Sequence, residues 1–215
     1  MLRTLLIILS LFMAACISGQ DCCESDTEQD SEISTEVVDE LPTVNWGNDT
    51  SEPTIPPSNI TWDACACVEG ENPCNIETID HDGNNFGLYA LYGRPIVLDF
   101  SAGWCGPCRQ AAMHAQEIQD NYRDTGLLYI TVLVETAEGT VPTEQDIRDW
   151  ADLYGNTDSL VIAGSRSMLE SAGGTWALTG WPTFYYIDRE MVLRDIDRGY
   201  NSQEVIYSIE WLLTL

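Results

Sequence analysis

The feature that most constrains the fold is a pair of cysteines at the junction of a buried strand and a helix. Residues 95–100 form a nearly continuous apolar run, typical of a strand buried on both faces. A helix is expected over residues 107–122, because proline is tolerated in a helix's first turn. Cys105 and Cys108 therefore stand where that helix begins, in the sequence Trp-Cys-Gly-Pro-Cys.

Cysteines at this spacing and place are suited to redox chemistry. A helix N-terminus presents unpaired N–H groups and the positive end of the helix dipole, which favour a thiolate. We expect Cys105 to be exposed and to attack, and Cys108 to lie deeper and resolve the mixed disulfide. The alternatives are half of a zinc site, which needs a second comparable pair, and a purely structural disulfide. The Gly-Pro between the cysteines suits a tight turn into a helix and favours a redox-active pair over these alternatives.

The rest of the globular part alternates between strand and helix patterns. A hairpin is expected from residues 76–79 and 86–88 around a turn at 81–84. The other expected elements are strands at 127–134, 160–162, 183–187 and 192–198, and helices at 143–154, 167–172 and 201–215. This order predicts an α/β fold: a central mixed sheet flanked by helices on both faces, with an N-terminal hairpin extension.

The N-terminus has the pattern of an export signal. A short basic start precedes an apolar run at residues 5–12, which is too short to span a bilayer as a helix. The small residues before Cys16 resemble a bacterial lipobox, although Met13 stands where Leu is usual. Residues 1–15 are thus predicted to be a lipoprotein-type signal peptide, with Cys16 lipidated. A secreted protein with Cys16 as a plain thiol and a retained anchor are the alternatives. All three place the remaining chain outside the cytoplasm.

Charge separates the next segment from the globular part. The chain of 215 residues carries 35 acidic residues, nine arginines and no lysine, for a net charge of −26. This argues against a nucleic-acid partner and against electrostatic attachment to an anionic membrane. Residues 16–60 are acidic and poor in apolar residues, so we predict a self-repelling, disordered tether spanning about 36 Å root-mean-square. Residues 61–215 are enough for one domain.

Two segments resemble the thioredoxin family. Residues 99–109 are similar to its active-site segment, and residues 180–184 to its cis-proline loop. With the hairpin and extra residues around 135–154, read as a helical insertion, the chain over residues 76–215 resembles the membrane-anchored TlpA/ResA-type branch. The resemblance implies a thioredoxin-like fold in which Pro182 is cis and faces the cysteines. It also implies that Asp99 is a buried carboxylate behind Cys108, with a raised pKa, that relays a proton.

The resemblance also implies a substrate groove beside the cysteines. The backbone of Trp181 would pair with an extended substrate. The groove residues are Trp104, Gly106, Pro107, Trp181 and Thr183. The chain departs from the family at Ala111, Met113 and Ser101, so the relay is expected through Asp99, and a narrow assignment to cytochrome c maturation is not favoured.

The other cysteines and the histidines are weaker candidates. One structural bridge is expected within Cys65, Cys67 and Cys74; a thiolate metal cluster and a relay to the active pair are the alternatives. Cys22 and Cys23 lie in the tether. His81 is expected in an exposed turn, and His114 is expected to pack or be solvated. A C-terminal apolar stripe is expected in the core: Val205, Ile206, Ile209, Leu212 and Leu213.

Together these features predict an extracytoplasmic thiol–disulfide oxidoreductase. Its substrates would be protein disulfides, which it would reduce with thiols resupplied by a membrane donor. It would be held to the membrane by the lipid on Cys16, with no bound cofactor or metal. The alternatives are an oxidase or isomerase of the same fold, a thiolate metal-binding chaperone and a non-catalytic surface adaptor. A peroxidase is disfavoured, because peroxide chemistry does not need a second cysteine at this spacing.

Overall fold

The computed structural model describes residues 65–215. The predicted signal peptide at residues 1–15 and the tether at residues 16–60 lie outside the described residues. So do Cys16, Cys22 and Cys23.

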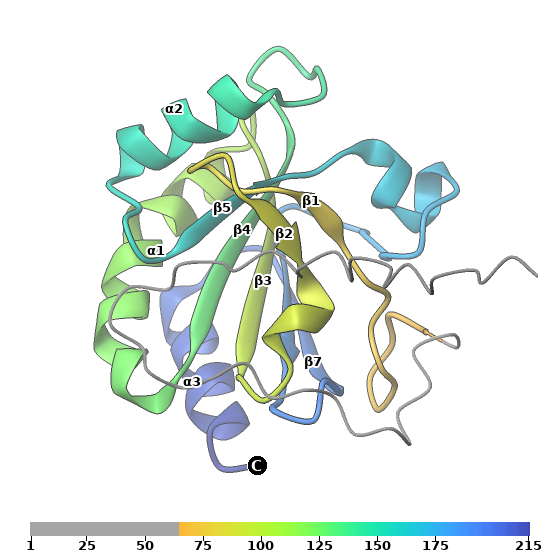
Figure 1. Cartoon of the computed structure of the whole chain (residues 1–215), viewed down its shortest axis with the longest axis vertical. Coiled ribbons are helices and arrows are strands. Elements are labelled where there is room, and N and C mark those ends of the chain that lie inside the picture. Colours follow the sequence, from red (N-terminus) through yellow and green to blue (C-terminus); the bar gives the residue numbers. More distant parts are fainter. Residues whose placement is uncertain (1–64) are drawn as a thin grey trace, which may run out of the picture. The chain divides into compact units, whose positions relative to one another are not determined.

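A mixed five-stranded sheet forms the centre of the domain, with strand order β5-β4-β3-β6-β7 (Figure 1). The first three strands along this order are parallel, and β6 runs antiparallel to both β3 and β7. This confirms the predicted fold class. The strands are β3 (Ile96–Ala102), β4 (Leu128–Glu135), β5 (Leu160–Ala163), β6 (Thr183–Ile187) and β7 (Leu193–Arg198).

The three α-helices all pack on one face of this sheet (Figure 1). They are α1 (Gly106–Tyr122), α2 (Glu144–Tyr154) and α3 (Ser202–Leu212). Helices α1 and α3 enclose Tyr129 and Phe184, while α2 covers Leu133 and Val161 on the same face. The crossovers from β3 to β4 and from β4 to β5 move in one direction along the sheet. Right-handed connections then place both helices on one face. Of the helices expected on both faces, all three α-helices lie on this face, and within residues 65–215 the other face has only short 3-10 turns.

The opposite face is covered by the hairpin and by short 3-10 turns. The hairpin pairs β1 (Glu77–Ile79) with β2 (Asn85–Gly87) as an antiparallel ladder. The 3-10 turns are η1 (Leu88–Leu91), η3 (Arg166–Met168) and η4 (Glu170–Ala172); a further one, η2 (Arg123–Thr125), follows α1. The short helix expected at 167–172 is therefore two turns, and beneath them Trp176 packs against Phe100 and Tyr185.

Two expectations about residues outside the cysteine pair need correction. His81 is buried rather than in an exposed turn, because the hairpin turn lies against β5, where Nδ1 of His81 accepts from the Val161 amide at 3.1 Å. Ile206 is 38% exposed, because it falls on the outer side of α3 while Val205 and Ile209 face the sheet. His114 is half-buried and stacks on Tyr200, as expected of a packing residue.

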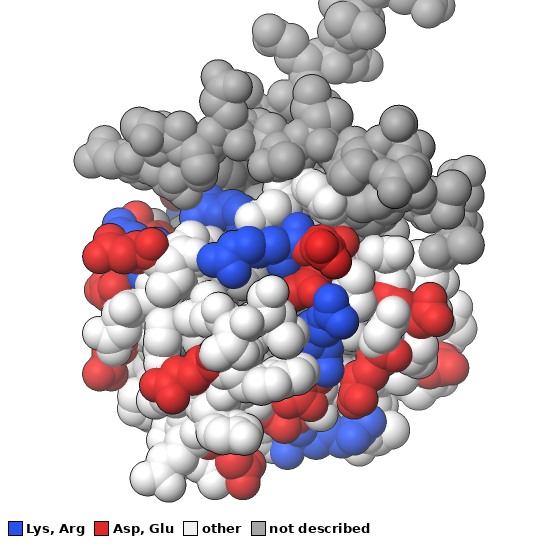
Figure 2. Space-filling view, turned by 90° about the horizontal axis from the view of Figure 1, so that it is seen from below, with Lys and Arg blue, Asp and Glu red and all other residues white. Residues whose placement is uncertain are grey.

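Charged side chains are interspersed over the face shown in Figure 2, where arginines lie next to acidic groups. Within residues 65–215, no helix is both long and apolar enough to cross a membrane.

Candidate active site

The cysteine pair stands where the sequence predicts, at the start of α1. Cys105 and Cys108 form a disulfide, and Cys105 is the N-cap residue of the helix. The sulfur of Cys105 accepts from the Cys108 amide at 3.2 Å, so one free N–H group of the helix end points at the attacking sulfur. Pro107 occupies the first turn of α1.

Cys105 is less accessible than expected. It is 4% exposed and Cys108 is fully buried, so the order of depth is right but Cys105 is not an exposed residue. The cause is the neighbouring Trp181 side chain. Trp181 packs on the cysteines and on Ala102, and its ring meets that of Trp104 edge to face at a centroid distance of 5.8 Å. Trp104 itself is 43% exposed.

The cis-proline loop lies beside this disulfide. The peptide bond between Trp181 and Pro182 is cis, and the Pro182 carbonyl accepts from Gly199 at 2.8 Å. Thr183 begins β6 and pairs with Phe100 of β3. Within residues 65–215 the backbone of Trp181 forms no hydrogen bond, so it is open to pair with an extended chain.

Asp99 is fully buried in β3, on the face of the sheet that α1 covers. Its carboxylate accepts from the Ser101 hydroxyl at 2.7 Å and from the Tyr129 hydroxyl at 3.0 Å. Burial raises the pKa of Asp99 to about 7, against the opposing effect of these two hydrogen bonds. Ser101, a departure from the family pattern, thus serves as a partner of the buried carboxylate. Among the described hydrogen bonds, none joins Asp99 directly to Cys108.

The sequence analysis missed Glu135. This residue ends β4 and pairs across the sheet with Ala102, next to the cysteines. Its buried carboxylate accepts from Nε1 of Trp104 at 2.7 Å and from Nη2 of Arg166 at 2.9 Å, and Nε of Arg166 donates to its other oxygen. The hydrogen bond from Arg166 is the main cause of a lowered pKa at Glu135. The only sequence signal for Glu135 was that a carboxylate ends an otherwise apolar strand.

The structure also contains the one bridge expected among Cys65, Cys67 and Cys74. A disulfide joins Cys65 to Cys74, and Cys67 is a buried thiol whose pKa is raised by burial to about 11. Within residues 65–215, no three His, Cys, Asp or Glu side chains gather as a metal ion would require.

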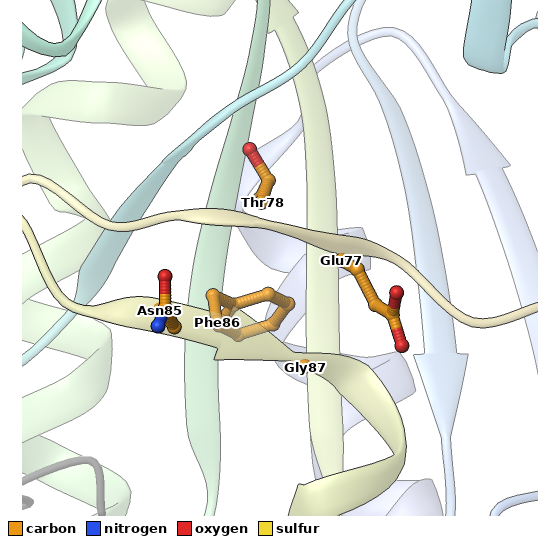
Figure 3. A pocket seen from close by; sticks show the side chains of 5 residues that line it. All are labelled: Glu77, Thr78, Asn85, Phe86 and Gly87. Atoms are coloured by element: carbon orange, nitrogen blue, oxygen red, sulfur yellow. The ribbon is translucent and has the colours of Figure 1, made fainter. Parts of the chain in front are cut away.

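A separate depression of about 320 Å³ lies on the hairpin and contains none of the predicted site residues (Figure 3). Its lining residues are Glu77, Thr78, Asn85, Phe86 and Gly87. The depression is therefore no part of the site built around the disulfide.

A thioredoxin-like sheet whose first long helix opens with a Cys-Gly-Pro-Cys disulfide, beside a cis-proline, defines the class of thiol–disulfide oxidoreductases. The chain belongs to the AhpC/TSA family, whose model matches residues 70–196, more than half of the chain.

Two relatives agree with this class. The thioredoxin-like protein YneN of Bacillus subtilis is 28% identical over 131 residues, 61% of this chain and 72% of YneN. The thiol-disulfide oxidoreductase ResA of Halalkalibacterium halodurans is 26% identical over 54% of this chain, which spans slightly less than two thirds of ResA, 62%.

Two solved structures are similar in fold. The thioredoxin domain of a thiol-disulfide oxidoreductase from Bacteroides vulgatus has a TM-score of 0.57 at 16% identity, covering 68% of this chain and 98% of its own. The exposed lipoprotein thioredoxin of Streptococcus pneumoniae has a TM-score of 0.50 at 23% identity, covering 66% of this chain and all of its own.

Proposed function

We propose that this chain is an extracytoplasmic, lipid-anchored reductase of protein disulfides that works through Cys105 and Cys108. One observation carries the proposal: the cysteine disulfide caps α1, with a buried carboxylate of raised pKa on the same face of the sheet. The Gly-Pro between the cysteines resembles reducing members of the thioredoxin family and favours this direction.

Reduction proceeds in two exchanges. In the reduced protein, the Cys105 thiolate attacks one sulfur of a substrate disulfide; a mixed disulfide forms and the substrate's other sulfur leaves as a thiolate. Cys108 then loses its proton and attacks the Cys105 sulfur, which releases the second substrate thiolate and closes the Cys105–Cys108 bridge. The two substrate thiolates take up protons. A membrane thiol donor restores the two electrons to the bridge by the same exchange.

Asp99 and the groove assist these steps. A carboxylate with a pKa of about 7 can accept the proton that Cys108 loses and return it later. The free backbone of Trp181 pairs with the extended substrate, and Pro182 holds this backbone beside the disulfide. The exposed residues Trp104, Gly106 and Pro107 complete the groove. Thr183, which was also expected there, is fully buried, and its hydroxyl donates to the Gly180 carbonyl.

The reduction potential of the Cys105–Cys108 couple tests the direction. The full chain would be equilibrated in defined thiol buffers, and the state of this pair read by mass mapping. A potential near about −270 mV supports the reductase, whereas one near about −120 mV makes the protein an oxidant of secreted thiols. Absence of a two-electron couple would remove the redox function and leave metal binding or scaffolding. The Cys108→Ser variant is the control that must lack the couple.

Anchoring has its own test. The motif before Cys16 supports lipidation, and so does the fold likeness to a lipoprotein thioredoxin. Lipid label and membrane association should both be lost in Cys16→Ala and kept in Cys22→Ala. A wild-type chain recovered unlabelled in the medium would instead make it a secreted protein.

A further inference from the structure

Three cysteines share one short loop away from the active site. Cys65 and Cys74 are bridged, and Cys67 remains a thiol inside the loop that this bridge closes. The two sides of the loop lie together, because the Ala66 amide donates to the Asn72 carbonyl at 2.9 Å. One bridge and one thiol among three close cysteines can be arranged in more than one way.

The position of the Cys67 sulfur singles out one alternative. It accepts a hydrogen bond from the Cys74 amide at 3.4 Å, so it lies against the residue that holds the bridge. Only Ala66 separates Cys65 from Cys67 along the chain, so both lie on the side of the loop opposite Cys74. A neighbour in the same loop reacts at a high effective concentration, without the cost of association.

The three cysteines differ in exposure. Cys65 lies on the surface, whereas Cys67 and Cys74 are buried. Cys67 packs in the core cluster that also contains Trp176 and Tyr185, under the segment that leads to the cis-proline loop. A bridge from Cys65 to Cys74 keeps the free thiol away from solvent. A bridge from Cys67 to Cys74 would place the free thiol outside.

We propose that the Cys65–Cys74 bridge and Cys67 form a second thiol–disulfide exchange site, which can present Cys65 as a surface thiol. The Cys67 thiol loses its proton and its sulfur attacks Cys74. A Cys67–Cys74 bond forms, the Cys65–Cys74 bond breaks, and the Cys65 sulfur leaves as a thiolate that takes up a proton. No external oxidant or reductant is consumed. The exposed Cys65 thiolate can then attack a disulfide of a second molecule, forming a mixed disulfide and releasing that molecule's other thiolate.

Burial sets the rate of this exchange. With a pKa of about 11, Cys67 is a thiolate in a small fraction of molecules at neutral pH, and that fraction rises about tenfold per pH unit. Of the two bridged cysteines, Cys65 is the better leaving group, because at the surface water solvates the departing thiolate. The exchange is therefore slow at neutral pH and faster in alkali. It goes beyond the proposed function, because no step uses Cys105 or Cys108.

The test traps the thiol that appears at the surface. The full chain would carry Ser at positions 16, 22 and 23, so that Cys67 is the only thiol while both bridges are oxidised. After treatment with iodoacetamide, peptide mapping without reduction locates the label and the bridge. We expect the label on Cys65 together with a Cys67–Cys74 bridge. Labelling should be about tenfold faster per pH unit and independent of protein concentration.

Two outcomes overturn the proposal. One is label on Cys67 with the Cys65–Cys74 bridge intact, which means local opening without exchange. The other is absence of label. Adding Cys67→Ser must abolish labelling of Cys65, since label there would come from another route. As a second measurement, Cys65→Ser should close a Cys67–Cys74 bridge on mild oxidation; persistence of two thiols in that variant also overturns the proposal.

Discussion

At the scale of single residues, the site divides into groups that the sequence reveals and groups that it hides. Asp99 could be predicted, because a carboxylate between apolar neighbours in a buried strand must itself be buried. Glu135 could not, because its partners are Trp104 and Arg166, each 31 residues away along the chain. Their contact depends on the pairing of β3 with β4 and on the turn after β5.

We predict that Glu135 holds the Trp104 indole in place beside the disulfide. Trp104→Phe and Glu135→Ala should each lower kcat/KM for a protein disulfide by about three- to tenfold, because each removes one side of the same hydrogen bond. The double variant should have a kcat/KM only slightly below that of the less active single variant, which a double-mutant cycle measures.

Controls separate positioning from general damage. Glu135→Gln keeps an acceptor for the indole and should recover most of the activity. A small disulfide that does not fill the groove should be reduced at nearly the wild-type rate by every variant. Strictly additive losses would show that Trp104 and Glu135 act independently.

Asp99 should make stability fall as pH rises. Its pKa is about 7 when folded, against an ordinary value of 3.8, so the folded state binds more protons between these values. The unfolding free energy should therefore decrease from about pH 4 to about pH 7, by at most about 4 kcal/mol. In urea unfolding of the oxidised protein, Asp99→Asn should remove this decrease and be the more stable chain at about pH 8.

Asp146 provides a control of opposite sign. Its pKa is lowered by hydrogen bonds from Thr143, so its contribution is present at neutral pH and is lost as pH falls through the folded value. Asp146→Asn should thus lose stability near pH 7 and not in acid. If the unfolding free energy of Asp99→Asn varied with pH in parallel with that of the wild type, Asp99 would not be the source of the pH dependence.

At the scale of elements, the local sequence pattern was sufficient to predict the type and position of most helices and strands. It was not sufficient to predict on which face of the sheet the helices pack. The apolar runs of β3 and β4 and the Thr143 start of α2 are local signals, and each element begins within about two residues of its expected place. Layering depends on crossover direction, which no local pattern contains, so the sequence did not show that α1, α2 and α3 share one face. The two 3-10 turns at 166–172 are too short for helical periodicity.

The junction between β3 and α1 depends on a close approach at Gly103. A Cβ on this residue would lie 2.6 Å from the Ala137 amide nitrogen and 2.7 Å from the Thr136 carbonyl carbon, both backbone atoms. Gly103→Ala should therefore lower the free energy of unfolding by about 1–3 kcal/mol and shift the backbone next to Trp104. Urea unfolding and kcat/KM would measure both effects.

Gly87→Ala is the matched control. Nothing lies within 4 Å of the Cβ that it would add, and this residue ends β2 in the hairpin. Its stability and activity should stay close to wild type. Equal losses in the two variants would mean that the packing at Gly103 is not what fixes the loop.

At the scale of the whole molecule, acidic charge dominates. Nine arginines face 35 acidic residues, so even complete pairing would leave most carboxylates without a cation. Arg123, Arg148, Arg166 and Arg194 each form an ion pair with an acidic side chain. Figure 2 shows arginines next to acidic groups, which relieves repulsion locally. The net field still opposes the compact state.

Salt should therefore stabilise this protein. Raising NaCl from about 10 mM to about 0.5 M screens repulsion between surface carboxylates, and a gain of about 1 kcal/mol would raise Tm by roughly 2–4 °C. Thermal unfolding at neutral pH measures this shift. Near the sequence pI of about 4.1 the net charge vanishes and the same salt step should change Tm little. A Tm that falls with salt at neutral pH would mean that ion pairs such as Arg166–Glu135 outweigh the repulsion.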